Sequence, residues 1–108
     1  MRYKSGATFK KELSISFNSN DSTVTSTYTA TADGYVIFQE QFSNASTSGY
    51  NAQININSIT IYRDQNTFMN KSNCYFEQTF LINNGDIISI QARYNLANNS
   101  IKARIYEY

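Results

Sequence analysis

Apolar and polar residues alternate with a period of two along most of this chain, and this pattern constrains the fold more than any other feature. It is clearest around Asp33-Gly34: Tyr28 and Ala30 alternate with threonines before this dipeptide, and a second apolar segment begins directly after it at Tyr35. A period of two is typical of a half-buried β-strand, and an Asp-Gly pair between two such segments predicts a tight turn. We therefore predict a hairpin whose two strands meet at Asp33-Gly34.

The same pattern predicts eight strands. Apolar residues recur with this period in segments 13–17, 24–30, 35–42, 50–56, 59–62, 74–82, 88–94 and 101–105. Segment 35–42 is apolar on both faces near its start, which predicts a buried central strand. No window of helical length shows a period of 3.6 residues. Eight short strands within 108 residues are typical of an all-β sandwich or barrel.

Two further turns and two loops follow from the spacing. The apolar positions change from even to odd numbers across Asn57-Ser58, which a two-residue hairpin turn explains; a β-bulge is the alternative. The run Asn83-Asn84-Gly85-Asp86 is the strongest turn signal in the chain. Two longer polar segments, 43–49 and 64–73, predict loops, where the binding residues of a rigid β scaffold usually lie.

Length and composition predict one domain over residues 1–108, with residues 1–7 as an N-terminal arm. The formal net charge of +1 does not favour binding to nucleic acid or to an anionic membrane. A single cysteine excludes an internal disulfide, and no apolar run approaches the length of a membrane span. The basic start at residues 1–6 has no apolar region after it, so we predict no cleavable secretion signal in this sequence.

The residue types in the sequence give little support for an enzymatic function. The sequence has no histidine that would serve as a base for Cys74, so this thiol is interpreted as a small buried side chain. Glu40 and Glu77 each lie within a predicted strand, and a carboxylate pair is what glycoside hydrolysis uses, but exposed strand positions explain both. No spacing of Asp and Asn matches a calcium loop. We predict a non-enzymatic protein without cofactor or metal ion.

A candidate ligand-binding region lies around the two polar segments. It consists of Tyr50, Tyr62, Arg63, Asp64, Asn66 and Asn70. Sugar sites combine the face of an aromatic ring with planar amide or carboxylate groups that pair with hydroxyls, and this set contains both. The alternative is a solvated loop whose asparagines satisfy the backbone of turns.

A second candidate surface lies on the last predicted strand, where Tyr106 and Tyr108 share a face with Lys102 and Arg104. Tyrosine is common at exposed strand positions, so one interpretation is ordinary exposed aromatics. The other is a subunit interface, where tyrosine supplies apolar area together with a hydroxyl group.

Three segments, in order, resemble a known family. Residues 29–38, 54–62 and 80–90 are similar to three segments of tumour-necrosis-factor-like and complement-type globular heads, with Ser58 where glycine is commoner. This family includes bacteriophage fibre-tip and decoration modules, and the resemblance extends over residues 24–108. It implies an eight- to ten-stranded antiparallel jelly-roll sandwich without catalytic residues, which forms a homotrimer through one sheet. On this basis the trimer interface is expected at Tyr35, Ile37, Tyr106 and Tyr108.

The resemblance leads us to expect a non-enzymatic virion module, either a fibre head or a capsid decoration, made in the host cytoplasm. Its expected partners are other virion proteins and a host-surface glycan or protein bound through loops, with no nucleic acid and no membrane insertion. Two alternatives stay open. One is a free-standing carbohydrate-binding module with Tyr50 and Tyr62 as its platform. The other is a small intracellular interaction or inhibitor protein that pairs an exposed edge strand with a partner.

Overall fold

The computed structural model describes residues 6–16, 23–42, 45–47, 50–66, 69–71, 74–93 and 100–108. Within these ranges the chain forms ten strands and no helix, so the predicted all-β class is confirmed. The strands are β1 (Thr8–Ser16), β2 (Val24–Thr29), β3 (Gly34–Phe42), β4 (Ala45–Thr47), β5 (Tyr50–Ile56), β6 (Ile59–Asn66), β7 (Met69–Lys71), β8 (Cys74–Ile82), β9 (Ile87–Arg93) and β10 (Ser100–Glu107). The described part of the chain contains no helix long and apolar enough to cross a membrane.

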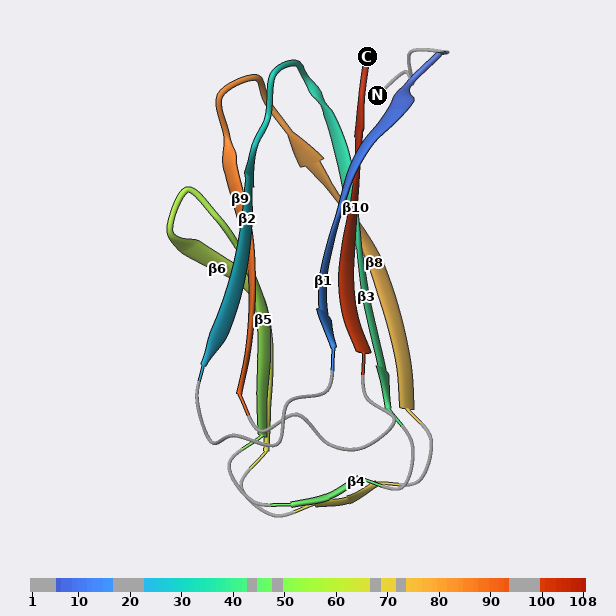
Figure 1. Cartoon of the computed structure of the whole chain (residues 1–108), viewed down its shortest axis with the longest axis vertical. Helices are drawn as coiled ribbons and strands as arrows, with labels where there is room; N and C mark the ends of the chain where they lie inside the picture. The colour runs from blue at the N-terminus through green and yellow to red at the C-terminus, as the bar shows by residue number, and fades with distance from the viewer. Residues whose placement is uncertain are drawn as a thin grey trace.

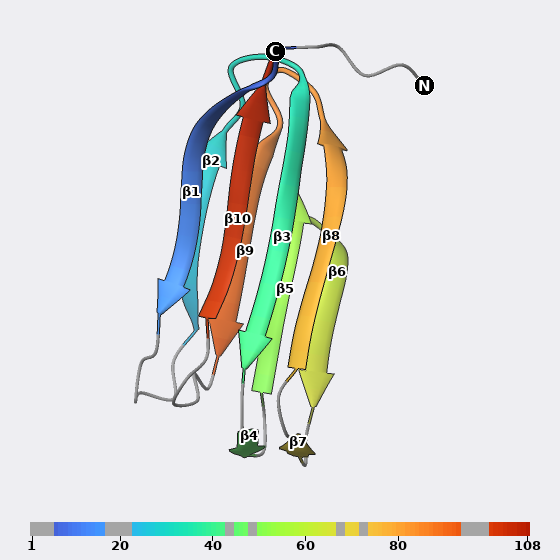
Figure 2. The same ribbon diagram turned by 90° about the vertical axis from the view of Figure 1, so that its right-hand side faces the viewer.

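Two four-stranded antiparallel sheets face each other and form a β-sandwich (Figures 1 and 2). The first sheet has the strand order β1-β10-β3-β8, and the second has the order β2-β9-β5-β6. The short strands β4 and β7 pair separately, at the lower end of the molecule in Figure 1. The prediction of loops at 43–49 and 64–73 is therefore wrong for residues 45–47, 64–66 and 69–71, which belong to β4, β6 and β7, and the β4–β7 pairing brings 45–47 and 69–71 side by side.

The strands pair as in one long hairpin folded around its middle. β5 pairs with β6 at the centre, and from there outward β4 pairs with β7, β3 with β8, β2 with β9 and β1 with β10. Apart from β5 and β6, no two consecutive strands are neighbours in a sheet. Most of the pairing therefore joins segments that are far apart in the sequence.

The predicted hairpin at Asp33-Gly34 is wrong. β2 before it and β3 after it belong to different sheets, as do β8 and β9 on either side of Asn84-Gly85. The two connections lie together at one end of the sandwich, where Ala30 N donates to the Asp86 carbonyl at 2.8 Å and Gly85 N donates to the Ala30 carbonyl at 2.9 Å. Turn residues mark where a strand ends, but they do not distinguish a turn within a sheet from a crossing between sheets.

Gly34 allows two strands to approach closely. It is the first residue of β3 and lies opposite Glu107 of β10. A Cβ atom at this position would collide with the backbone carbonyl oxygen of Tyr106. The sequence pattern assigned this glycine to a turn, whereas its position requires glycine because of the neighbouring backbone.

Asn57-Ser58 forms the predicted hairpin turn between β5 and β6. Both residues have positive φ, 54° and 67°, as the two central residues of a type I′ turn do. The β5–β6 pairing also shifts register between Ile54 and Asn55, so the β-bulge offered as the alternative is present as well. The turn accounts for the change of phase between Ile56 and Ile59, and the bulge at Ile61 returns the even-numbered Tyr62 to the position opposite Ile54.

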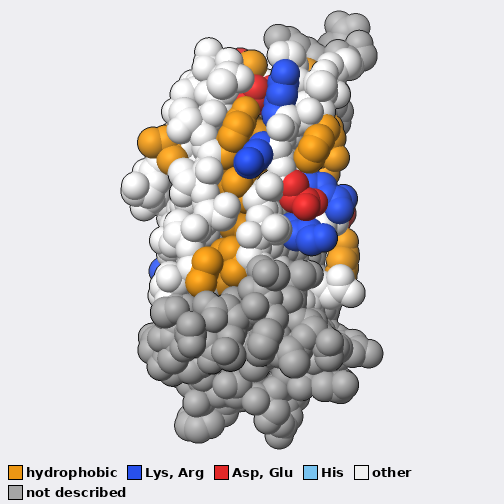
Figure 3. Space-filling model, viewed as in Figure 1, with side chains coloured by type: hydrophobic (Ala, Val, Ile, Leu, Met, Phe, Trp, Pro, Cys, Tyr) orange, Lys and Arg blue, Asp and Glu red, His pale blue; other side chains and the backbone are white. Residues whose placement is uncertain are grey.

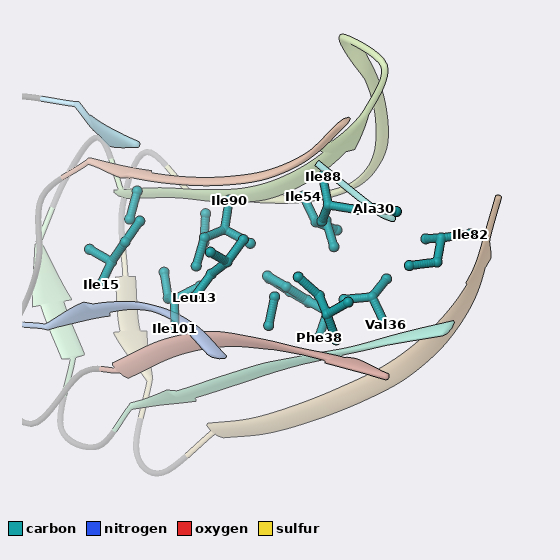
Figure 4. Packing of buried hydrophobic residues seen from close by; sticks show 14 residues of the cluster. Leu13, Ile15, Ala30, Val36, Phe38, Ile54, Ile82, Ile88, Ile90 and Ile101 are labelled. Carbon is teal, nitrogen blue, oxygen red and sulfur yellow. The ribbon is translucent and has the colours of Figure 1, made fainter. Parts of the chain in front are cut away.

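Side chains from the inner faces of both sheets form one hydrophobic core, and Phe38 is its largest member (Figure 4). The buried residues are Leu13, Ile15, Ala30, Val36, Phe38, Ala52, Ile54, Ile82, Ile88, Ile90, Ala92, Ile101, Ala103 and Ile105. β3 is a central strand of its sheet, as predicted for segment 35–42. Only its inner face is buried, however, and Tyr35 and Ile37 on the outer face are half-buried.

Candidate functional site

The outer face of the first sheet carries a row of large side chains that crosses all four strands (this sheet faces the viewer in Figure 2). The register places Phe9 of β1 opposite Tyr106 of β10, Tyr106 opposite Tyr35 of β3, and Tyr35 opposite Leu81 of β8. Tyr108, directly after β10, contacts the ring of Tyr35. We call these five residues the aromatic row. Phe9 is 51% exposed and Leu81 is 52% exposed, so accessible apolar side chains flank the tyrosines on both sides.

The central rings of the row face each other. The ring centroids of Tyr35 and Tyr106 are 5.0 Å apart, and the planes are 17° from parallel. Parallel rings at this distance cannot lie side by side in one plane, so their faces overlap. Phe9 contacts Tyr106 edge to face at 5.6 Å, and Tyr108 contacts Tyr35 in the same manner at 6.4 Å. Much of the ring surface is therefore covered by other rings of the row.

The residues predicted for the trimer interface lie close together. Tyr35, Ile37 and Tyr106 share the outer face of the first sheet, and Tyr108 contacts Tyr35. The backbone N–H of Tyr108 donates to the carbonyl of Asp33 at 3.0 Å, which holds this tyrosine against the β2–β3 connection. A role of these residues in a trimer stays a prediction.

Sequence reasoning missed Phe9 and Leu81. Phe9 has the same odd numbering as the buried residues Leu13 and Ile15, but a register shift between Phe9 and Lys11 turns it to the outer face. Leu81 follows Phe80 in a strand whose even-numbered residues form the predicted core face. A leucine at the outward position was therefore a readable signal of an apolar outer surface.

A polar cluster lies on the same face, along the strands from the aromatic row. Gln39 Nε2 donates to Glu77 Oε1 at 2.6 Å, and the hydroxyl of Tyr75 donates to the same oxygen at 2.8 Å. The hydrogen bond from Gln39, together with that from Tyr75, holds the pKa of Glu77 below its ordinary value. The bond to Glu77 raises the pKa of the Tyr75 hydroxyl. Tyr75 is nevertheless 60% exposed, so its ring is accessible beside an amide and a carboxylate.

The predicted ligand-binding residues do not converge on one described surface. Tyr62 stacks on Phe76 of β8, with centroids 4.3 Å apart and planes 9° from parallel, and its ring lies 5.7 Å from that of Phe38. This tyrosine therefore packs at the edge of the core between the two sheets. Arg63 points to the outer face of the second sheet, where its Nε donates to Gln53 Oε1 at 3.1 Å.

The other four members of this set lie towards the β4–β7 end. Asp64 pairs with the buried Ala52 on the side of β6 that faces the core. Tyr50 and Asn66 are opposite each other at the open end of the β5–β6 hairpin, and Asn70 lies in β7. The side chains of Tyr50, Asn66 and Asn70 lie outside the described residues. The ligand-binding role of this set stays a prediction.

The two mid-strand glutamates lie on opposite faces of the first sheet. Glu40 is fully buried on the inner face of β3, whereas Glu77 is exposed on the outer face of β8. The expectation of exposed positions is therefore wrong for Glu40, because the second sheet covers the inner face of this central strand. The two carboxylates do not face each other across a shared site, as glycoside hydrolysis would require.

Glu107 is a second buried carboxylate, and it links the two sheets. Its side chain accepts hydrogen bonds from the Tyr28 hydroxyl at 2.9 Å, the Thr31 backbone N–H at 2.9 Å and the Thr31 hydroxyl at 2.5 Å. Burial raises the pKa of the Glu107 carboxyl, but these hydrogen bonds and the charge of Lys10 outweigh burial and hold the pKa below its ordinary value. Burial and the bond to Glu107 raise the pKa of Tyr28. Both carboxylate oxygens of Glu107 accept hydrogen bonds in this network, which ties β10 to β2 and to Thr31 after it.

No three His, Cys, Asp or Glu side chains in the described ranges are grouped so that they would hold a metal ion.

Neither a protein-family model nor a curated protein sequence matches the chain. Among solved structures, it is similar to part of a ruminal GH26 endo-beta-1,4-mannanase, with 15% identity, a TM-score of 0.44 and coverage of 98% of this chain but 20% of that one. It is also similar to part of dimeric latent PorU from Porphyromonas gingivalis, with 14% identity, a TM-score of 0.41 and coverage of 88% and 10%. The chain thus spans a fifth or less of either protein. At these values the likeness assigns no function, and the resemblance to tumour-necrosis-factor-like heads stays a prediction.

Proposed function

We propose that the sandwich is a jelly roll and that the protein is a non-enzymatic assembly and binding module. The nested pairing supports the first part, because a jelly roll is built as a long antiparallel hairpin wrapped into two sheets. Here every strand of the first half pairs with its counterpart in the second half around the β5–β6 turn.

The aromatic row is the observation that carries the functional proposal. Exposed apolar surface gains about 25 cal/mol per Å² when it is removed from water, and tyrosines are enriched where proteins contact one another. The rings of Tyr35 and Tyr106 cover each other, so the row offers a partner ring edges and hydroxyl groups rather than open ring faces. A sugar stacks on an open face, and a protein surface does not need one.

The form of assembly that we propose is a homotrimer built through the outer face of the first sheet, as in the family that the sequence resembles. In this proposal the module belongs to a virion, as a fibre head or capsid decoration, and the loops at the β4–β7 end bind a host-surface glycan or protein. Other virion proteins are its remaining partners.

Light scattering on the intact chain tests the trimer. The expected mass is three times the chain mass of 12.3 kDa, or a multiple of that trimer. The double substitution Tyr35→Ser and Tyr106→Ser should lower the mass threefold, and the matched double substitution Thr25→Ala and Thr27→Ala on the second sheet should not. A monomer or a dimer at micromolar concentration would contradict the trimer.

A free-standing carbohydrate-binding module is the second candidate function, and the polar cluster favours it. The exposed ring of Tyr75 lies beside the amide of Gln39 and the carboxylate of Glu77, which is the combination that sugar hydroxyls and a sugar face require. A glycan array with the intact chain and with Tyr75→Ala tests this candidate. Binding that is lost in Tyr75→Ala and kept in Tyr35→Ser would support it.

A further inference from the structure

β8 is an edge strand that lacks the features with which proteins protect such edges. It is the last strand of the first sheet, it is nine residues long, and it pairs with β3 without a register shift (right-hand edge of the front sheet in Figure 2). In an edge strand, alternate N–H and C=O groups point away from the sheet and are available to another strand.

The other three edges differ from β8. β1 has a register shift next to Lys10 and Lys11, and Lys and Arg side chains separate the hydrophobic patches near this edge in Figure 3. β2 is six residues long, and β6 contains a bulge together with Arg63 and Asp64. Bulges, charges and short length all discourage pairing with another chain. β8 contains a single charged residue, Glu77, whose carboxylate is already bound on the outer face of the sheet.

The side chains of β8 form a pattern that is symmetric about Gln78. Residues at equal distance on either side of Gln78 match an apolar or aromatic side chain with another one, or the carboxylate of Glu77 with the hydroxyl of Thr79. The pairs are Glu77 with Thr79, Phe76 with Phe80, Tyr75 with Leu81 and Cys74 with Ile82. Tyr75 and Leu81, at matching positions near the two ends, are 60% and 52% exposed on the same outer face.

We propose that β8 pairs antiparallel with β8 of a second copy of this chain, around a two-fold axis at Gln78. This pairing joins two four-stranded sheets into one continuous sheet. Tyr75 of each copy then lies opposite Leu81 of the other. The two-fold axis gives two such contacts, and in each of them two exposed apolar side chains cover one another. Phe76 lies opposite Phe80, and the two Gln78 amides meet at the axis.

Charge selects this register. With the axis at Gln78, Glu77 lies opposite Thr79, a neutral side chain that can donate a hydrogen bond. Moving the axis to Glu77 would place the two carboxylates directly opposite each other, and like charges at such a position are destabilising. Moving it to Thr79 would place Glu77 opposite Leu81 and leave Tyr75 opposite Asn83. The axis at Gln78 is the one that matches apolar with apolar and carboxylate with hydroxyl.

Sedimentation of the intact chain and three variants tests the proposal. Thr79→Glu places a carboxylate opposite Glu77 at two symmetric positions, so the edge contact should weaken about tenfold or more. At a concentration near the dissociation constant of the intact chain, the weight-average mass of this variant should fall by about a quarter, towards that of the unpaired unit. Thr79→Gln, which adds no charge, should keep the mass, and so should Thr25→Glu, the same new charge on the edge strand β2. Thr79 and Thr25 are both exposed.

The two-fold edge contact and the proposed trimer give different signatures. Loss of the edge contact halves the mass, whereas loss of the aromatic-row contact lowers it threefold. Either proposal can therefore fail while the other holds. If Thr79→Glu has the same mass as the intact chain at every concentration, the edge proposal is overturned. If the intact chain shows no even-numbered assembly up to about 100 μM, a weak limit for a specific contact, it is overturned as well.

Cross-linking gives a second measurement that does not depend on affinity. With Cys74→Ser to remove the native thiol, a short bis-maleimide should link Gln78→Cys into a covalent dimer, because the two positions meet at the axis. Thr25→Cys in the same background should stay monomeric on a denaturing gel. Equal yields from the two cysteines would contradict the assigned axis.

Discussion

The outer faces of the two sheets differ in their side chains: the second sheet carries a hydrogen-bonded polar network, and the first sheet exposes apolar residues. On the second sheet, Asn51 donates to Gln53 at 3.2 Å, Gln53 donates to Asn55 at 3.1 Å, and Arg63 donates to Gln53 at 3.1 Å. We call this set, with Thr60, the polar ladder. The first sheet instead exposes Phe9, Tyr75 and Leu81 on its outer face.

This difference is the reason why we propose the outer face of the first sheet, and not that of the second, as the contact surface. Polar side chains that bond to one another are already satisfied, and a partner would have to replace those bonds. Apolar side chains exposed to water gain free energy only when something covers them. Of the five exposed large hydrophobic residues in the described ranges, the two that lie outside the first sheet, Ile59 and Ile87, are the first residues of their strands and lie beside turns.

Truncation of Phe38 to alanine should have the largest effect, because this side chain belongs to the core that both sheets share. Phe38 is 0% exposed, and loss of a buried phenylalanine costs about 3–5 kcal/mol of unfolding free energy. Urea unfolding followed by circular dichroism and by tyrosine fluorescence should show a single transition at a lower midpoint. Ile37→Ala, on the outer face of the same strand, should cost about 1 kcal/mol.

Two separate unfolding transitions in that experiment would contradict the comparison between the two outer faces. The sheets would then be independent units, and the difference between their outer faces would no longer describe two sides of one sandwich.

Replacing Glu107 with glutamine should have the next largest effect, about 2–3 kcal/mol at neutral pH. The carboxylate accepts hydrogen bonds from Tyr28 and Thr31, which belong to β2 and the connection after it. In a glutamine the amide oxygen can keep the bonds from Tyr28 and the Thr31 N–H in one orientation only, its NH₂ group must then donate to the Thr31 hydroxyl, and all three bonds lose the negative charge that strengthens them. Urea unfolding of the variant gives the value, and Tyr28→Phe, which removes one of the hydrogen bonds, should cost about 1 kcal/mol.

The contribution of Glu107 should depend on pH in one direction. The pKa of Glu107 is lowered in the folded state from its ordinary value of 4.5. A lowered folded pKa means that the unfolded chain binds the proton more readily, so the stabilisation is fully present above the ordinary pKa and is lost as the pH falls from there through the lowered folded pKa. The difference between the intact chain and Glu107→Gln should therefore shrink between about pH 6 and about pH 3. A constant difference over this range would show that the charge of Glu107 is not what stabilises the fold.

Alternation predicted where strands lie and which face of each is buried, because both depend on neighbouring residues. Leu13, Ile54, Ile88 and Ile101 are in the core as their spacing indicated. Strand partners depend on residues far apart in the chain, and β1 pairs with β10. The period of two carries no information about such pairing, which is why Asp33-Gly34 was assigned to a hairpin.

The alternation pattern likewise does not predict that Glu40 and Glu107 are buried. Carboxylates are rarely fully buried unless they are paired, so a glutamate in a strand predicts an exposed position. Glu107 is buried because Thr31, 76 residues earlier, supplies two of its hydrogen bonds. The aromatic row was found in part: alternation grouped Tyr106 with Tyr108, but the register shift beside Lys10 hid Phe9.

Substitution of Gln53 by alanine tests whether the outer face of the second sheet contributes to folding and not to assembly. Gln53 is the centre of the polar ladder, with hydrogen bonds to Asn51, Asn55, Thr60 and Arg63. Its loss should lower the unfolding free energy by about 1–2 kcal/mol and leave the mass in light scattering unchanged. Tyr106→Ala on the aromatic row should instead lower the mass in light scattering, because it removes a ring from the proposed interface. An altered mass for Gln53→Ala would mean that the ladder is part of an interface.

The smallest expected effect concerns the ion pair between Glu12 of β1 and Arg104 of β10, which lies on the outer face of the first sheet. The Arg104 Nε and Glu12 Oε1 atoms are 3.1 Å apart, and the side chains are 41% and 37% exposed. Water screens a pair this exposed, so a double-mutant cycle with Glu12→Ala and Arg104→Ala should give a coupling that is indistinguishable from zero, and added salt should not change it. A coupling comparable to the loss in Gln53→Ala would mean that the outer face of the first sheet contributes to folding as the polar ladder does. A coupling near zero would keep the contrast between the two outer faces, and the exposed side chains of Phe9, Tyr75 and Leu81 would remain the surface proposed for a partner.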